Sequence, residues 1–322
     1  MIFRFEKILL VLLIAVFGLL PIVVYPLLNG VETIPTDGPE TNKETFIISS
    51  AFEQVAAVAT AFVIKPVYTL MALTVAIILW NKSQLELKAL KWSMLFFFIG
   101  ENFCAANFLF TRNHDSYLLE YLHGLGMALS FGFAAFAAME GIDHHALRFS
   151  DAKKSCGLAG FCRRCHKFEE VSCGLQSIFI LFGAAGAIIA MMPLAAQFHT
   201  ISYSTNIWGT PYTYKHPLVY QLAEIRYFPL LASALFLAAA ITLGLKDEHP
   251  LHPSKLLFAA AMGVMGFSLF RFVVFQGFRT RLVWMDFWEE ISEFIYIALV
   301  VAILWYFRRS LFTPRAKPNP AE

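Results

Sequence analysis

The sequence predicts an all-α integral membrane protein with about eight transmembrane helices, and three observations lead to this fold class. The first is composition, because 58% of the 322 residues are hydrophobic and only 15% are charged. Soluble domains average about a quarter charged residues. The second is that about eight apolar runs reach the roughly 20 residues that cross a bilayer as a helix. The third is an uneven distribution of Lys and Arg between the segments that connect these runs.

Each predicted span rests on its own apolar run. The first, 8–28, follows Arg4 and Lys7 as a secretory signal would. It is longer than the ~7–15 residues of a signal core and no A-x-A cleavage site follows, which favours an uncleaved span. The other spans are predicted at 58–80, 92–110, 117–139, 174–196, 223–244, 256–278 and 287–307. The Pro-containing tail, 313–322, is predicted to be disordered.

The distribution of basic residues predicts the orientation. If the N-terminus is cytoplasmic, the inside segments hold 17 Lys and Arg and the outside segments hold 5. Because cytoplasmic loops carry an excess of Lys and Arg, we expect a bacterial cytoplasmic (inner) membrane protein with both termini inside. The expected partners are the lipid bilayer and other membrane or redox subunits. Nothing in the sequence indicates nucleic-acid binding.

The two halves of the chain share a pattern that predicts an internal repeat. Each half begins with a Phe-Glu pair, a first span and a polar external loop. A basic residue then precedes a Pro-bearing second span, with Lys65 in one half and Arg226 in the other. We therefore expect a parallel duplication of a four-helix unit, with repeats at 1–140 and 174–312 and a Cys-rich cytoplasmic loop at 141–173.

Ionisable residues lie at matching points of the two halves, inside otherwise apolar runs. Charged groups in hydrocarbon cost several kcal/mol, so such residues face one another, water or a ligand. We predict that they form one polar site in the outer half of the membrane and that Glu101 and Arg271 form a direct ion pair. The predicted members of the site are Glu101, Glu120, His123, Arg271, Glu290, Glu293, Lys65 and Arg226.

Three kinds of chemistry fit this polar set. Glu120-x-x-His123 has the spacing used by carboxylate-bridged di-iron bundles, although Glu290-x-x-Glu293 stands where a second Glu-x-x-His is found in the full pattern. A proton or ion path uses the same carboxylates as carriers, with His123 as the residue suited to proton exchange near neutral pH. The third alternative is structural, because Glu–Arg and Glu–Lys pairs also fix the packing of helices.

The predicted cytoplasmic loop carries a second candidate site. Four of the five cysteines fall within 18 residues, and a reducing cytosol argues against disulfides. Zn or an Fe–S cluster is the expected ligand, although the spacing of the first two cysteines is one residue longer than in the plant-type Fe–S pattern. Covalent haem c would use the same C-x-x-C-H motif but needs the loop on the outer face, which the basic residues disfavour. The candidate metal ligands are Cys156, Cys162, Cys165, His166 and Cys173.

These features favour a redox-linked or metal-linked membrane protein, with a thiol-ligated centre on the cytoplasmic face and an outer site for a quinone, a di-metal centre or a proton. One alternative is a proton-coupled transporter whose cysteine loop holds a structural Zn ion. Another is a non-catalytic membrane subunit or sensor. The sequence contains no P-loop, G-x-S-x-G or dinucleotide-binding motif, and it leaves open whether the protein is an enzyme.

Overall fold

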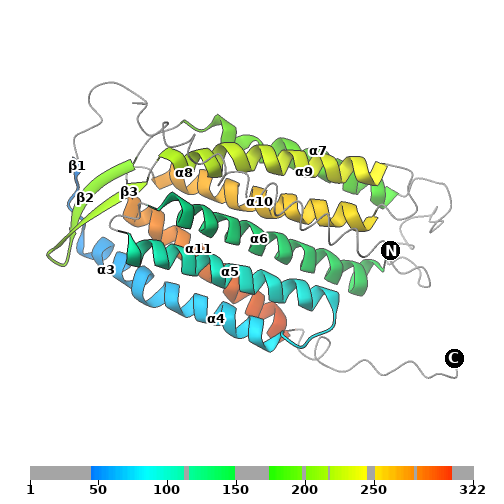
Figure 1. Ribbon diagram of the computed structural model, residues 1–322, viewed down its shortest axis with the longest axis horizontal. Coiled ribbons are helices and arrows are strands. Elements are labelled where there is room, and N and C mark those ends of the chain that lie inside the picture. The colour runs from blue at the N-terminus through cyan, green and yellow to red at the C-terminus, as the bar shows by residue number, and fades with distance from the viewer. Residues whose placement is uncertain are drawn as a thin grey trace.

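The computed structural model describes residues 45–111, 116–148, 174–197, 201–216, 218–244, 251–278 and 281–306. In these segments long helices run side by side along the longest axis of the molecule, and a small sheet lies at one end (Figure 1). The predicted first span at 8–28, most of the loop at 141–173 and the tail at 313–322 lie outside the described residues.

The first half of the described chain contributes three long helical segments. The first consists of α3 (Ala51–Ala59), the π-helical segment η3 (Thr60–Ile64) and α4 (Lys65–Ile78). A capping box starts it, because Ser50 N donates to Glu53 Oε2 at 2.8 Å and Glu53 N donates to Ser50 Oγ at 3.3 Å. The wider turn of η3 immediately precedes Pro66, which cannot donate a helical hydrogen bond. Helices α5 (Leu85–Phe110) and α6 (Tyr117–Ile142, followed by the π-helical η4, Asp143–Leu147) complete this half.

The second half contributes four long helical segments. Helix α7 (Gly174–Ala190) ends in a 3-10 turn, η5 (Met192–Ala195). The short α8 (Leu218–Leu222) and π-helical η6 (Ala223–Tyr227) run directly into α9 (Phe228–Gly244). Helices α10 (Leu251–Phe278) and α11 (Leu282–Tyr306) follow. A π-helical segment thus precedes the second span of each half. The duplication itself stays a prediction.

A β-hairpin forms where the sequence predicted only a polar external loop. Strand β2 (Ile201–Ile207) pairs antiparallel with β3 (Thr210–His216), and the two-residue β1 (Thr45–Phe46) pairs parallel with β2. The turn residues Trp208 and Gly209 have φ angles of 49° and 81°, the left-handed conformation that two-residue hairpin turns require. Trp208 N donates to Gln54 Oε1 at 2.8 Å, which fixes the hairpin to α3.

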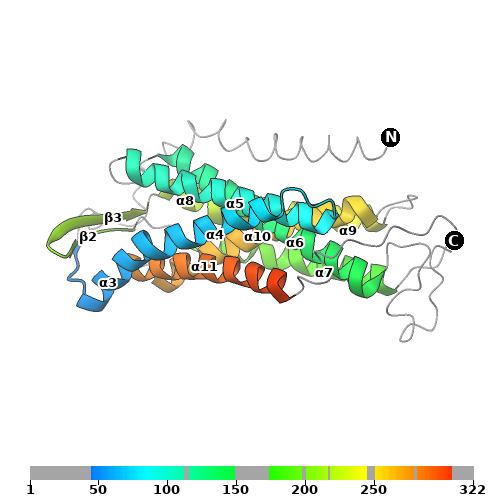
Figure 2. The ribbon, with the colours of Figure 1, turned by 90° about the horizontal axis from the view of Figure 1, so that it is seen from below.

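The order of the helices in space places α6 and α10 at the centre of the bundle. Helix α6 packs against α5 on one side and α10 on the other, and α10 packs against α9, which contacts α7 (Figure 1). On the other side of α5, α4 contacts both α5 and α11, and Figure 2 shows α4 between them. Close approach is possible because glycines lie at the crossings. A Cβ at Gly126 would lie 2.7 Å from Gly100 Cα, at the crossing of α5 and α6.

The helices fit a lipid bilayer. Within the described segments, six helical stretches are long and apolar enough to cross a membrane, at Ala51–Ile78, Leu85–Phe110, Tyr117–Leu147, Ser177–Ala195, Tyr220–Gly244 and Leu251–Phe278. Large apolar side chains such as Ile188 and Leu109 are more than two-thirds exposed, as lipid-facing residues are. The protein is a multi-pass helical membrane protein. Helix α11 is a seventh long helix but carries several acidic residues and is not among the six, so the predicted total of eight spans is met only in part.

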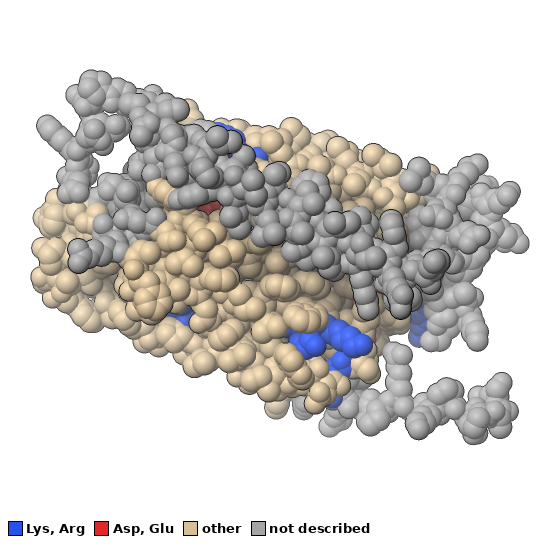
Figure 3. All heavy atoms as spheres, in the orientation of Figure 1, with Lys and Arg blue, Asp and Glu red and all other residues tan. Residues whose placement is uncertain are grey.

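Charged side chains are sparse on one face of the bundle (Figure 3). On the face drawn in Figure 3, the helices are mostly uncharged, and Lys and Arg gather toward the end where α4 is connected to α5. Lys82, Lys88 and Lys91 belong to this region of the sequence, and the Lys91 Nζ atom lies 4.9 Å and 5.1 Å from the rings of Trp80 and Trp92. Such basic and aromatic residues are typical of membrane–water interfaces.

Candidate functional site

Ionisable side chains converge inside the bundle, in the part of the helices nearer the small sheet. We describe them as two groups that meet at His123. The Lys65 group lies between α4, α5 and α11, and the Arg271 group lies between α6, η6, α10 and α11. Every side chain in both groups is at most 17% exposed. Most of their described contacts are with one another, and Asn107 of α5 also donates to Glu120 Oε2 at 3.4 Å.

The Lys65 group surrounds one phenol and one ammonium with three carboxylates. The Nζ atom of Lys65 lies 2.7 Å from Glu101 Oε2 and 2.8 Å from Glu290 Oε1. The hydroxyl of Tyr68 lies 2.8 Å from Glu101 Oε2 and 2.7 Å from Glu293 Oε2, and it also contacts Glu290. A phenol has one proton to donate, so it satisfies one of these carboxylates at a time. This group therefore holds more acceptors than its own donors can satisfy.

His123 connects the two groups and is almost completely buried. Its Nδ1 atom lies 3.1 Å from the carbonyl oxygen of Gly100, and because a carbonyl only accepts, Nδ1 is the donor. In the neutral ring the Nε2 atom carries the lone pair, and this atom has no hydrogen-bond partner. Nδ1 also lies 3.5 Å from Glu101 Oε1, and Nε2 lies 4.0 Å from Glu289 Oε1, so the ring is near one carboxylate from each group.

The Arg271 group surrounds one guanidinium with three carboxylates. The guanidinium nitrogens of Arg271 lie 2.5 Å from Glu289, 3.3 Å from Glu224 and 3.4 Å from Glu120. The guanidinium also packs 5.2 Å from the ring centre of Phe267, a cation–π distance. A small cavity lined in part by Glu120 and Glu224 adjoins this group. The Oε2 atom of Glu224 has no hydrogen-bond partner.

The two groups together hold an excess of acidic side chains. Among the described residues, six glutamates are in contact with only two basic side chains, Lys65 and Arg271, and with His123. The glutamates are Glu101, Glu120, Glu224, Glu289, Glu290 and Glu293. Even a protonated His123 leaves at least three negative charges without compensation if all six are ionised. Uncompensated buried charge costs several kcal/mol per ion, so the described residues leave these carboxylates to take up protons or other cations.

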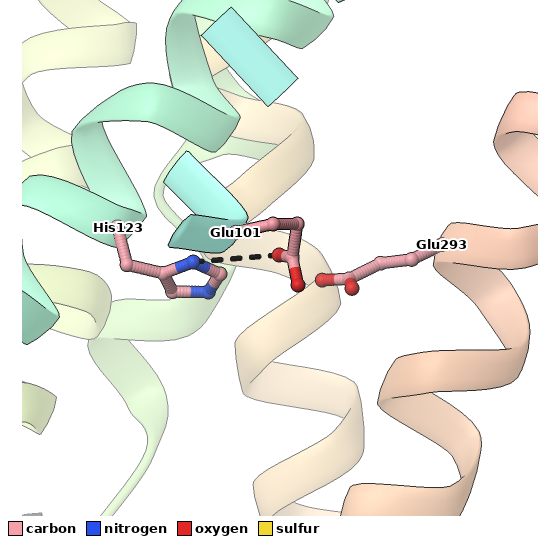
Figure 4. Close-up of side chains that lie close together, drawn as sticks. All are labelled: Glu101, His123 and Glu293. Carbon is pink, nitrogen blue, oxygen red and sulfur yellow. Dashed lines mark ion pairs between the residues drawn. The ribbon is translucent and has the colours of Figure 1, made fainter. Parts of the chain in front are cut away.

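Three of these residues form a group with the geometry of metal ligands. One ligand atom from each of Glu101, His123 and Glu293 lies within 4.8 Å of the others, and all three residues are buried. Figure 4 shows their side chains pointing toward one another from α5, α6 and α11. The Oε1 atom of Glu101, like Nε2 of His123, has no hydrogen-bond partner.

The structure brings together seven of the eight residues predicted for this site but pairs them differently from the prediction. The predicted ion pair between Glu101 and Arg271 is absent among the described contacts, because Glu101 pairs with Lys65 and Arg271 pairs with the three glutamates of its own group. The contacts described for Arg226, which shares η6 with Glu224, are with backbone carbonyls. Its guanidinium donates to the carbonyl oxygens of Pro193, at 2.9 Å, and Ala196.

Sequence reasoning missed Tyr68, Glu224 and Glu289. Each carried a usable signal. Tyr68 follows Lys65 by three residues, so both lie on one face of α4. Glu224 lies inside a predicted span, and Glu289 directly precedes the predicted member Glu290.

A separate polar cluster lies near the opposite ends of α6 and α10. Lys255 Nζ lies 3.0 Å from Glu140 Oε1 and also contacts Asp143, and all three residues are buried. His144 lies 3.6 Å from Glu140 and His145 lies 3.5 Å from Glu86. These contacts join α5, α6, η4 and α10, as in an ion-pair network that fixes the packing of helices.

The cysteine loop could not be compared with its prediction, because Cys156, Cys162, Cys165, His166 and Cys173 lie outside the described residues. Metal binding there stays a prediction. Comparison of the chain with known protein families, curated proteins and solved structures gave no match. Any functional conclusion therefore rests on the geometry of the site.

Proposed function

We propose that this membrane protein translocates cations through the acidic site formed by the Lys65 and Arg271 groups. The observation that carries the proposal is the charge imbalance among the described residues, where six buried or nearly buried glutamates have Lys65, Arg271 and His123 as the basic side chains in contact with them. An ion-pair network that only fixes the packing of helices does not need such an excess of acidic side chains. An acidic excess inside apolar helices instead favours a site that a cation from solution occupies.

The arrangement of the groups suggests a route for the cation. The cavity beside Glu120 and Glu224 supports entry at the Arg271 group. His123 then links Glu289 of that group, at 4.0 Å, to Glu101 of the Lys65 group, at 3.5 Å. A cation moving along this series exchanges one carboxylate for the next, without leaving a polar environment.

The proposal includes an orientation. We place the protein in a bacterial cytoplasmic membrane with both termini and the cysteine loop in the cytoplasm, so that the acidic site lies in the outer half of the membrane. The support is the excess of Lys and Arg in the segments predicted to lie inside and at the α4–α5 end, because cytoplasmic loops of membrane proteins carry an excess of Lys and Arg. The lipid bilayer is then the first partner of the protein.

Currents across a reconstituted membrane test the proposal. Proteoliposomes on a solid-supported membrane receive concentration jumps of protons, Na⁺, K⁺ or Mn²⁺, and the charge moved is recorded. At least one cation is expected to produce a current in the wild type that is lost in Glu293→Gln. The matched control is Asn102→Gln, since Asn102 is adjacent to Glu101 but exposed on α5. Absence of current with every cation, or full current in Glu293→Gln, would contradict the proposal.

A redox-linked role is the second candidate function. The observation that favours it is the group of Glu101, His123 and Glu293, whose carboxylate and imidazole ligands also suit redox-active iron or manganese. In that case the cysteine loop, as a Zn or Fe–S site, would be part of the same protein's metal chemistry. Electron transfer to a quinone analogue by the metal-loaded protein would support this role, and cation currents without it would favour translocation.

A further inference from the structure

We propose that Glu101, His123 and Glu293 bind one divalent first-row transition metal ion. This inference deepens the proposed function and rests on it for one point only, namely that the bound ion is the translocated species. The binding site itself stands on its own geometry. One ligand atom from each residue lies within 4.8 Å of the others, and the three side chains come from three different helices (Figure 4).

The spacing of the ligand atoms is close to that of a bound site. With metal–ligand bonds of about 2.1 Å, the ligand atoms of a tetrahedral site lie about 3.4 Å apart. In the structure one ligand atom from each residue lies within 4.8 Å of the others, and Glu101 Oε1 lies 3.5 Å from His123 Nδ1, the nitrogen that faces Gly100 O. Binding through His123 Nε2 therefore requires the imidazole and the two carboxylates to draw together around the ion.

The hydrogen bonds around the three residues prepare them for an ion. A metal-bound histidine usually donates its other ring N–H to a carbonyl or carboxylate, which orients the ring. Here His123 Nδ1 donates to Gly100 O at 3.1 Å, and the buried Nε2 has no hydrogen-bond partner. Glu101 has one oxygen held by Lys65 and Tyr68 and the other, Oε1, without a hydrogen-bond partner. Two of the four buried atoms without a hydrogen-bond partner in the two groups therefore belong to the proposed ligands, and the other two are Glu224 Oε2 and Arg271 Nε.

The ligand types define the class of ion. Mg²⁺ and Ca²⁺ prefer oxygen ligands alone, whereas an imidazole with two carboxylates suits Mn²⁺, Fe²⁺, Co²⁺ or Zn²⁺. Lys65 limits the number of ions. Its Nζ atom lies between Glu101 and Glu290, at 2.7 Å and 2.8 Å, where a second bridged metal would need to lie. The structure therefore favours one ion here over a di-metal centre.

Electron paramagnetic resonance with Mn²⁺ tests the site on the purified full chain. Mn²⁺ is the probe because it prefers oxygen and nitrogen ligands to thiolates, which separates this site from the cysteine loop. The wild type is expected to bind one Mn²⁺ with nitrogen hyperfine coupling from a coordinated imidazole. His123→Ala should lose this coupling, and Glu293→Gln should weaken binding by more than about tenfold, since even the loss of an outer partner has that effect. Asn102→Gln is expected to match the wild type in both properties.

The outcomes separate this inference from the proposed function. No bound Mn²⁺ in the wild type, bound Mn²⁺ without nitrogen coupling, or nitrogen coupling that persists in His123→Ala would overturn the metal site. If His123→Ala does not fold, the wild-type coupling and the affinity of Glu293→Gln decide the question. Mn²⁺ binding with the expected coupling but without currents would keep the site and contradict translocation. Currents carried by monovalent cations in a protein that does not bind Mn²⁺ would support translocation and contradict the metal site.

Discussion

Gly263 controls how closely α6 and α10 approach, and Gly263→Ala tests whether this approach positions the site. A Cβ built at Gly263 would lie 2.2 Å from Ala128 O, 2.5 Å from Gly132 N and 2.7 Å from Gly132 Cα. All three obstructing atoms are backbone, so no side chain can rotate to make room. Carbon–oxygen contacts normally lie at about 3.5 Å, and the two helices would need to separate by about 1 Å.

Two opposing effects determine how much Gly263→Ala changes the free energy of unfolding. Overpacking a well-packed core costs about 1–3 kcal/mol, and we expect the upper end because the clash is with backbone. Replacing glycine by alanine in a helix contributes about 1 kcal/mol of stabilisation in return. The free energy of unfolding of Gly263→Ala should therefore fall by about 2 kcal/mol.

The matched control is Gly277→Ala in the same helix, where an added Cβ would meet nothing within 4 Å. This variant should be unchanged or more stable, by up to about 1 kcal/mol. Reversible unfolding in mixed detergent micelles with increasing SDS measures both. Because His123 on α6 packs against Phe267 on α10, with ring centres 6.2 Å apart, Gly263→Ala should also weaken Mn²⁺ binding. Equal stabilities for the two variants would refute the reasoning.

Three further predictions concern charges and orientation. Arg271→Ala should lower the free energy of unfolding by about 3–5 kcal/mol, because it leaves three buried carboxylates without their cation. The control is Arg281→Ala, which should lower it by at most about 1 kcal/mol because the Arg281 side chain is 49% exposed. Similar losses in the same SDS unfolding measurement would contradict this. Lys255→Met should also destabilise by about 3–5 kcal/mol while leaving Mn²⁺ binding unchanged, because its cluster is separate from the acidic site; a loss of Mn²⁺ binding would show that the clusters are coupled. Impermeant thiol reagents applied to intact cells should not label the cysteines of the 141–173 loop, and strong labelling from outside would reverse the proposed orientation.

Much of the fold could be predicted from the sequence because the bilayer imposes a simple requirement. A run of about 20 apolar residues satisfies its own backbone hydrogen bonds only as a helix. The predicted span limits differ from the helices mainly at polar residues. Helix α10 begins at Leu251 instead of 256, because Lys255 is buried against Glu140 and Asp143 and does not end the helix. A hydropathy pattern cannot anticipate such a partner.

The membership of the site could be predicted better than its pairing. Glu101, His123 and Glu293 were identified because ionisable residues in apolar helices must meet a partner. The partner of each depends on the rotation of every helix about its axis, which sequence spacing leaves undetermined. The π-helical segment η3 changes the rotation of α4 just before Lys65 and helps to turn it toward Glu101. Arg226, itself inside a π-helical segment, instead reaches the carbonyls at the end of α7.

The stability of the purified protein as a function of cation concentration tests the central claim most directly, namely that the acidic site takes up a cation from solution. A ligand that binds only the folded state stabilises it, by about 2.7 kcal/mol at a concentration 100 times its Kd. The account predicts that Mn²⁺ raises the SDS concentration at which the wild type unfolds, while choline at equal ionic strength does not. It also predicts that Glu293→Gln loses most of this response. A wild-type stability that is the same in Mn²⁺, Na⁺, K⁺ and choline would contradict the account.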